Sequence, residues 1–282
     1  MKSFNFLVLL SGMYVSPVVA AASYTVDDAA KKGLIKYAFK SKGGYTGNVI
    51  ELSVTNLSEG KLDLKIDAGR RLDSKKEEEQ DILVTRTQEF FVNAKQKKTI
   101  SVFGMCCQAH NHSPSKGNAY GIGNPASPLL QKLAHFIDST GNFENYTAQE
   151  AVWTVSDNNS ISSIDGDDST VVNKFKKYVS AITGRPIPKY NVTYRGDETD
   201  VGGRATKIEG VFNYTVNQNG HITIAIYDES GKLVQVFMQD MPHERGDCKL
   251  YYTFNTRNLP TGTYYARMSN DGMVEKQEKI EF

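Results

Sequence analysis

Net charge, cysteine and tryptophan are all scarce in this sequence. It carries 33 basic and 32 acidic side chains, for a formal net charge of +1, with three cysteines and one tryptophan among 282 residues. A near-neutral chain has no general attraction for nucleic acid or for an anionic membrane, so we expect neither as a partner. Because the number of cysteines is odd, at least one has no disulfide partner within the chain.

The familiar signatures of enzymes are also missing. The sequence contains no G-x-S-x-G, no Walker loop, no dinucleotide fingerprint and no H-E-x-x-H. Each of these motifs places a nucleophile, a phosphate-binding loop or a metal ligand, so a hydrolase would lack a recognisable site. We therefore expect a non-enzymatic protein without a metal or another cofactor. No segment beyond the N-terminus is long and apolar enough to cross a membrane as a helix.

The first 22 residues have the pattern of a secretory signal peptide. Lys2 precedes an apolar run from Phe4 to Val15, and the small residues around Ala20 fit a cleavage site. The run is too short and too interrupted to span a bilayer. We expect residues 1–22 to be removed and the mature protein to be exported. The 260 residues that remain of the 282 are enough for two domains.

Alternating apolar and polar residues dominate the next part of the chain. The stretches with this alternation are 34–39, 49–57, 62–69, 81–94 and 97–107. An alternation with a period of two residues is typical of strands with one buried face, and polar turns separate these stretches. The pattern predicts an antiparallel β-sandwich.

From Pro125 the apolar spacing becomes helical. A first helix is expected over 127–137, and a second from Thr147, whose side chain would form a capping box with Glu150. A third is expected to begin near Asp168 and to end at Gly184. These helices would follow directly on the predicted sandwich.

The remainder of the chain returns to a β pattern. Residues 185–204 are polar and rich in glycine and proline, which is typical of a linker. Six strand candidates follow, with turn signals at 230–231 and 271–272. The sequence thus predicts a mainly β protein, in which a sandwich domain with C-terminal helices over 23–184 precedes an Ig-like sandwich over 205–282.

The C-terminal part contains NYTVNQNGHITIAIYDESGKLV and then NLPTGTYYARM. With these pieces, residues 210–282 resemble the C-terminal sorting domain of type IX secretion cargo. The resemblance implies that the secretion machinery is a partner and that the protein is secreted or held at the cell surface. Structural Ig-like domains of flagellar hook-capping type share the same hairpin, and the ending EKIEF is less basic than is common in the sorting family. A structural role for this module therefore stays open.

The N-terminal part contains FGMCCQAHNHSP and AQEAVWTVSD. Residues 34–165 resemble an uncharacterised family of exported bacterial proteins, and these two pieces also resemble the thioester domains of Gram-positive surface adhesins. In those domains a cysteine at a strand end is joined to the glutamine of a Q-x-x-I-W helix motif. The matching positions here are Cys106 and Gln149, with Trp153 one helical turn further on.

The resemblance implies a specific reaction. The Cys106 thiolate would attack the Gln149 carboxamide and release ammonia, with His110 or His112 as proton donor and Trp153 as apolar cover. The N-terminus of the helix that carries the glutamine would favour the thiolate. A lysine amine of a host or cell-surface protein would then displace the sulfur. This chemistry would make the protein a covalent adhesin-like module.

Two other interpretations of the cysteine pair remain. Cys106 and Cys107 could be small buried residues at a strand end, with the glutamine and tryptophan as ordinary helix and core residues. They could also bind a metal with His110 and His112, but adjacent cysteines point to opposite sides of a strand and rarely share an ion. We rank the packing interpretation first and the metal site last. On this reading, an N-terminal domain binds an unidentified partner and a C-terminal module directs secretion or anchoring.

Overall fold

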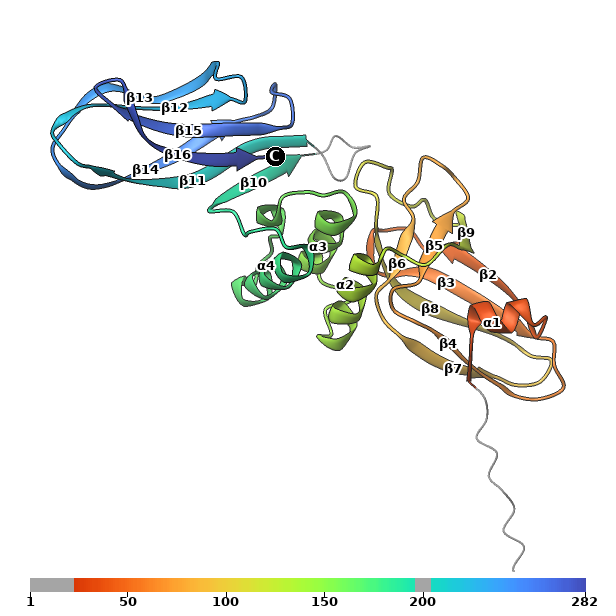
Figure 1. Ribbon diagram of the computed structural model, residues 1–282. Helices are drawn as coiled ribbons and strands as arrows, with labels where there is room; N and C mark the ends of the chain where they lie inside the picture. The colour runs from red at the N-terminus through yellow and green to blue at the C-terminus, as the bar shows by residue number, and fades with distance from the viewer. Residues whose placement is uncertain (1–22, 196–203) are drawn as a thin grey trace, which may run out of the picture.

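The computed structural model describes residues 23–195 and 204–282 (Figure 1). The predicted signal peptide, 1–22, and part of the predicted linker, 196–203, lie outside these ranges. The N-terminal strands and helix are β1 (Ser23–Thr25), α1 (Val26–Lys31), β2 (Ile35–Ser41), β3 (Thr46–Asn56), β4 (Leu62–Ile66), β5 (Arg71–Ser74), β6 (Ile82–Val84), β7 (Gln88–Val92), β8 (Lys97–Cys106) and β9 (Ala119–Ile122).

The rest of the described chain is a helical segment followed by long strands. The helices are α2 (Pro128–Ser139), α3 (Tyr146–Ser156), the 3-10 turn η1 (Ile161–Ser163) and α4 (Ser169–Thr183). The C-terminal strands are β10 (Tyr190–Arg195), β11 (Arg204–Val216), β12 (Gly220–Asp228), β13 (Leu233–His243), β14 (Gly246–Asn255), β15 (Thr263–Asn270) and β16 (Met273–Glu281). The mainly β class with a small helical part is confirmed.

The first domain has two β layers. Strands β1, β4 and β7 form one sheet, and the other six close into a barrel in the order β2-β3-β8-β6-β5-β9. Leu64 and Ile66 of β4 share a buried core with Leu52 and Val54 of β3, so the small sheet packs against the inward-facing side of this wall of the barrel. The predicted sandwich describes this pair of layers. The barrel closes through β9, a four-residue strand too short for its alternation to be recognised in the sequence.

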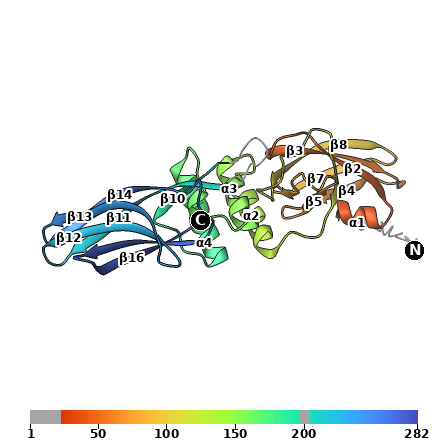
Figure 2. The same cartoon turned by 90° about the horizontal axis from the view of Figure 1, so that it is seen from above.

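The helices lie between the barrel and the C-terminal sheets (Figures 1 and 2). Their apolar faces form a core with one side of the barrel, in which Leu133, Val152 and Phe175 are fully buried. Asp168 caps the N-terminus of α4 by accepting from two backbone N–H groups, and Gly184 ends this helix in the left-handed conformation at φ 72°. Both ends agree with the sequence prediction.

The predicted capping box of the second helix is wrong. Helix α3 begins one residue earlier, at Tyr146, because the side chain of Asn145 accepts from the backbone N–H of Thr147 and serves as the cap. Thr147 is buried within the first turn rather than at the cap position. Glu150 is hydrogen-bonded to Tyr146 instead of reaching back to a capping residue.

The C-terminal domain is a sandwich of two antiparallel sheets, in the orders β10-β11-β14 and β13-β12-β15-β16. Phe212, Ile224 and Phe254 lie fully buried between the sheets. Strand β10 occupies a part of the chain predicted to be linker and pairs with β11 over its whole length. Its Val192 is buried in the sandwich core, so this sheet begins before residue 205.

Among the described residues, no helix is long and apolar enough to cross a membrane.

Candidate functional site

The cysteine pair lies at the end of strand β8. Cys106 pairs with Ile82 of β6, and its backbone N–H donates to the carbonyl of Tyr45 at 3.0 Å. Its side chain is fully buried in the barrel core, whereas that of Cys107 is buried in the core shared with the helices. The two thiols therefore point to opposite sides of the strand, as expected for neighbouring residues.

Gln149 meets Cys106 from the first turns of α3. The carboxamide is completely buried; its Oε1 accepts from the Cys106 N–H at 3.0 Å, and its Nε2 donates to the Cys106 carbonyl at 2.8 Å. Both polar atoms of the side chain are thus occupied by the backbone of one residue. The structure brings together the two residues on which the thioester hypothesis depends, through the backbone of Cys106.

Trp153 lies one helical turn beyond Gln149 and is 2% exposed. Its indole stacks on the ring of Tyr45, with centroids 6.2 Å apart, and belongs to the same core as Cys106. The indole N–H donates to Gln80 Oε1 at 3.2 Å. Trp153 thus lies in the core that contains Cys106, and its hydrogen bond ties the helix to the segment before β6.

Burial makes both thiols poor acids. It raises the pKa of Cys106 well above the ordinary value, and the pKa of Cys107 is raised by the same cause, with a further contribution from Asp81. Burial thus opposes the Cys106 thiolate that the helix N-terminus was expected to favour.

The two histidines of this segment lie in a different environment. His110 and His112 are exposed, whereas the cysteines are buried. The backbone of His112 pairs with the segment before β6: its N–H donates to Glu78 at 2.8 Å, and its carbonyl accepts from Gln80 at 3.0 Å. Within the described ranges, no group of three or more histidine, cysteine or acidic side chains is arranged to hold a metal ion.

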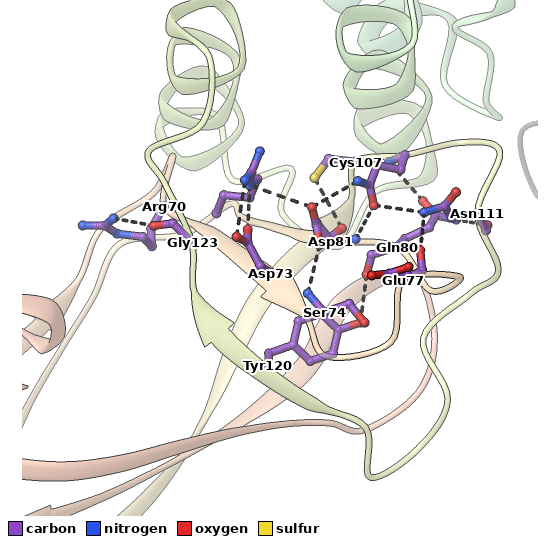
Figure 3. Close-up of polar contacts among 12 residues, drawn as sticks. Arg70, Asp73, Ser74, Glu77, Gln80, Asp81, Cys107, Asn111, Tyr120 and Gly123 are labelled. Atoms are coloured by element: carbon purple, nitrogen blue, oxygen red, sulfur yellow. Dashed lines mark hydrogen bonds and ion pairs between the residues drawn. The ribbon is translucent and has the colours of Figure 1, made fainter.

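A network of side-chain amides and carboxylates holds the segment that follows the cysteines (Figure 3). The sequence analysis did not predict this network. Asp81 accepts from the Ser74 N–H at 2.9 Å and from Gln108 Nε2 at 3.1 Å, and Gln108 Oε1 accepts from the Asp81 N–H at 2.7 Å. The Cys107 thiol donates to the Asp81 carbonyl at 3.3 Å. Burial raises the pKa of Asp81.

Gln80 is the centre of the second half of the network. Its fully buried carboxamide accepts from the Gln108 N–H and from Trp153, and it donates to the Asn111 carbonyl at 3.0 Å. The Tyr120 hydroxyl of β9 donates to the Gln80 carbonyl at 2.9 Å. The run EEEQD at 77–81 predicts only a polar turn in the sequence. Its part in the network could not be predicted, because its partners come from distant segments.

Glu79 holds the far end of the segment that follows the cysteines. Burial alone would raise its pKa, but hydrogen bonds from Lys76 and Ser115 outweigh that effect and lower the pKa to about 2. Its carboxylate also accepts from Asn118 Nδ2 at 2.7 Å. The segment after the cysteines is therefore fixed by charged and amide hydrogen bonds at both ends.

Comparison with known proteins identifies the C-terminal part of the chain. Residues 208–280 match the family model described as "Secretion system C-terminal sorting domain". The chain therefore ends in a type IX sorting domain, which implies interaction with the secretion machinery and export to the outer membrane or cell surface. The match begins within β11 and ends within β16, so β10, which pairs with β11 in the first sheet, lies outside the matched residues.

The other comparisons add little. No curated protein matches this chain. Among solved structures, that of CBM51-2 in complex with GlcNAc and INT domains from Clostridium perfringens ZmpB aligns with 85% of this chain and 77% of its own, at 10% identity. Its TM-score of 0.14 is too low to support any conclusion about fold or function.

Proposed function

We propose that this protein is an exported, non-enzymatic surface or secreted protein. Its C-terminal sandwich, 190–282, would direct secretion or anchoring, and its N-terminal domain would bind a partner outside the cell. The observation that carries the proposal is the match of residues 208–280 to the sorting-domain family. The predicted signal peptide supplies the first export step, across the inner membrane.

Truncation at the domain boundary tests the export function. A chain that lacks 190–282 should accumulate in the periplasm of its own host, because the signal peptide remains but the sorting module is gone. A periplasmic reporter fused to 190–282 should in turn reach the surface or the medium. Surface or medium levels of the truncated chain equal to those of the intact protein would show that the C-terminal sandwich has a structural role instead.

The non-enzymatic assignment draws support from the polar groups around the cysteine pair. The polar side chains here bond to one another, to backbone groups or to Trp153; they belong to Gln80, Asp81, Gln108 and Gln149. The Cys107 thiol donates to a backbone carbonyl. A catalytic site needs a nucleophile beside a base, with space for a substrate. Here the hydrogen-bonding groups are used in holding the loop.

A second candidate function is a covalent adhesin-like module. The observation that favours it is the contact between the buried Gln149 carboxamide and the backbone of Cys106. Formation of the thioester would join Cys106 Sγ to Gln149 Cδ, with loss of the thiol proton and the amide nitrogen as ammonia. An amine from a host or cell-surface protein would later form an amide with the glutamyl group and restore the thiol.

A further inference from the structure

One face of the barrel carries a group of lysines that form no salt bridge within the described residues. In β2 the residues alternate, so that Ile35 and Phe39 are buried in the core, whereas Lys36 and Lys40 are exposed on the outer side. On β8 the exposed residues include Lys97. We call Lys36, Lys40, Lys42, Lys75 and Lys97 the lysine face.

The strand register places these side chains on one surface. Lys36 and Lys97 are both paired with Thr55 of the central strand β3, from opposite sides. Since neighbouring strands lie about 4.8 Å apart, the two lysines start on the order of 10 Å from each other. Lys42 donates to Ser101 Oγ at 3.1 Å, which places its ammonium on the same side.

Lys75 joins this surface through the last strand of the barrel. Ala119 of β9 pairs with Lys40, so Ala119 faces outward as Lys40 does. Every second residue of β9 counted from Ala119 faces outward as well. Gly121 is one of these, and a Cβ on Gly121 would stand 3.0 Å from Lys75 Nζ. The ammonium of Lys75 therefore lies over the outer side of β9.

Between the lysines the surface is rich in hydroxyls. The outward positions between the lysines are Glu51, Ser53 and Thr55 on β3 and Thr99 and Ser101 on β8; the Ser53 and Thr99 hydroxyls bond at 2.9 Å. Ala38 is the outward residue of β2 between Lys36 and Lys40. The outward positions of β2 and β3, and those of β8 from Lys97 to Ser101, carry no large apolar side chain.

Five other lysines of the same domain have acidic partners, whereas Lys32 and Lys98 lie over the rings of Tyr24 and Phe91. Salt bridges join Lys31, Lys61, Lys65, Lys76 and Lys95 to aspartate or glutamate side chains. In the described part of the chain, no salt bridge is formed by any member of the lysine face. Glu51 lies on the face, and Asp73 at its border is held by Arg71 at 2.7 Å. The surplus positive charge is therefore local, although the whole chain is nearly neutral.

We propose that the lysine face binds an anionic polysaccharide, a sugar chain that carries sulfate or carboxylate groups. Spaced ammonium groups would pair with repeated acidic groups, and the serine and threonine hydroxyls between them would bond to sugar hydroxyls. A membrane surface fits less well, since peripheral insertion uses exposed apolar side chains. Single-stranded nucleic acid fits less well because its bases stack on aromatic rings, and none lies among these outward positions.

This inference rests on the proposal that the N-terminal domain is a binding module, and it names the partner class. Its test uses purified protein, whereas the export function is tested by localisation in cells, so the two can fail separately. The probes are dextran sulfate and polygalacturonate, with uncharged dextran as the negative control. The intact protein should bind both acidic polymers, release them as salt rises, and ignore dextran.

Charge reversal locates the binding surface. The triple variant Lys36→Glu, Lys40→Glu and Lys97→Glu should bind dextran sulfate roughly a hundredfold more weakly at low ionic strength. The matched control is Lys177→Glu, Lys232→Glu and Lys249→Glu, which changes the net charge equally at exposed lysines elsewhere. The control should bind as the unchanged protein does.

A second variant avoids dependence on the fold of the triple mutant. Thr99→Glu places one negative charge at the centre of the face, at an exposed position, and should also weaken binding while leaving the melting temperature nearly unchanged. Failure of the intact protein to bind either acidic polymer would overturn the proposal. Equal losses in the two triple variants would do the same, as would tighter binding to anionic vesicles or to DNA than to the polysaccharides.

Discussion

At the scale of single residues, glutamine side chains complete the hydrogen bonding of strand ends. Gln149 bonds to both backbone groups of Cys106, and Gln88 does the same for β8 by donating to Ser101 and accepting from Phe103. A carboxamide has one donor end and one acceptor end, as a peptide group has, so it can bond to a strand as a neighbouring strand does. At Cys106 it shares the N–H with the carbonyl of Tyr45. This role accounts for a buried Gln149 without any reaction.

The covalent hypothesis makes a different prediction for the same residue. If Cys106 and Gln149 form a thioester, the intact mass of the purified protein, prepared without reductant, should be lower by one ammonia. Methylamine should then add to the protein and release one free thiol. Mass spectrometry and thiol titration measure both effects.

Two variants make this experiment specific. Cys106→Ala should abolish the mass deficit and the methylamine adduct, whereas Cys107→Ala should keep both, because the thiols point to opposite sides of β8. An unmodified mass for a folded sample would leave the glutamine with its hydrogen-bonding role alone.

The resemblance to thioester domains indicated which residues of the site meet, but not the environment in which they meet. Local patterns alone gave the strand that ends at Cys106 and the helix that carries Gln149 and Trp153. The hydrogen bonds of Gln80, Asp81 and Gln108 join segments about 30 residues apart, and no local pattern encodes them. Burial, which decides the thiol pKa, is likewise a property of the folded chain.

At the scale of elements, helix α3 carries a titratable group on its partly covered side. Burial is the main reason that the pKa of Glu150 is raised to about 7 from 4.5; Asp165 raises it further, and a hydrogen bond with Tyr146 opposes the rise. In the unfolded chain Glu150 loses its proton near pH 4.5, whereas in the folded chain it keeps it to about pH 7. The stability of the folded state should therefore decrease as pH rises through this window.

Glu150→Gln tests this dependence. The neutral amide cannot ionise, so the variant should lose less stability than the unchanged protein between pH 4.5 and about 7. At higher pH the variant should be more stable by about 2 kcal/mol, a value reduced for the partial exposure of the side chain. Chemical denaturation across the pH range measures the effect. Parallel pH profiles of the two proteins would show that Glu150 is ionised at its ordinary pKa.

The sequence predicted most elements, and the exceptions have a physical reason. The long strands of the C-terminal domain and helices α2 and α4 have strong periodicity and clear ends, and they appear where expected. Strand β10 was missed because Tyr190, Val192 and Tyr194 alternate over only a few residues beside prolines. The cap of α3 was misplaced because Asn145 and Thr147 both suit a cap, and packing decided between them.

At the scale of the whole molecule, the two domains are joined by a short connection with specific contacts. Arg185, just after α4, donates to the carbonyls of Thr154, Asn158 and Asn159 at the C-terminal end of α3. The Tyr194 hydroxyl of β10 accepts from the Ser160 N–H at 3.3 Å. The boundary therefore falls in the few residues before β10, and residues 185–204 are not a simple linker.

The position of this boundary can be tested with separate domains. We expect a piece comprising 190–282 to fold alone with one cooperative transition, because it contains both sheets and the core around Phe212 and Phe254. A piece that begins at residue 205 lacks β10, which removes the buried Val192 and leaves the edge of β11 unpaired. Loss of a buried valine and of a strand's hydrogen bonds should cost it at least about 2 kcal/mol of unfolding free energy. Denaturant titration of the two pieces measures the difference, and equal stability would mean that the sorting domain is complete without β10.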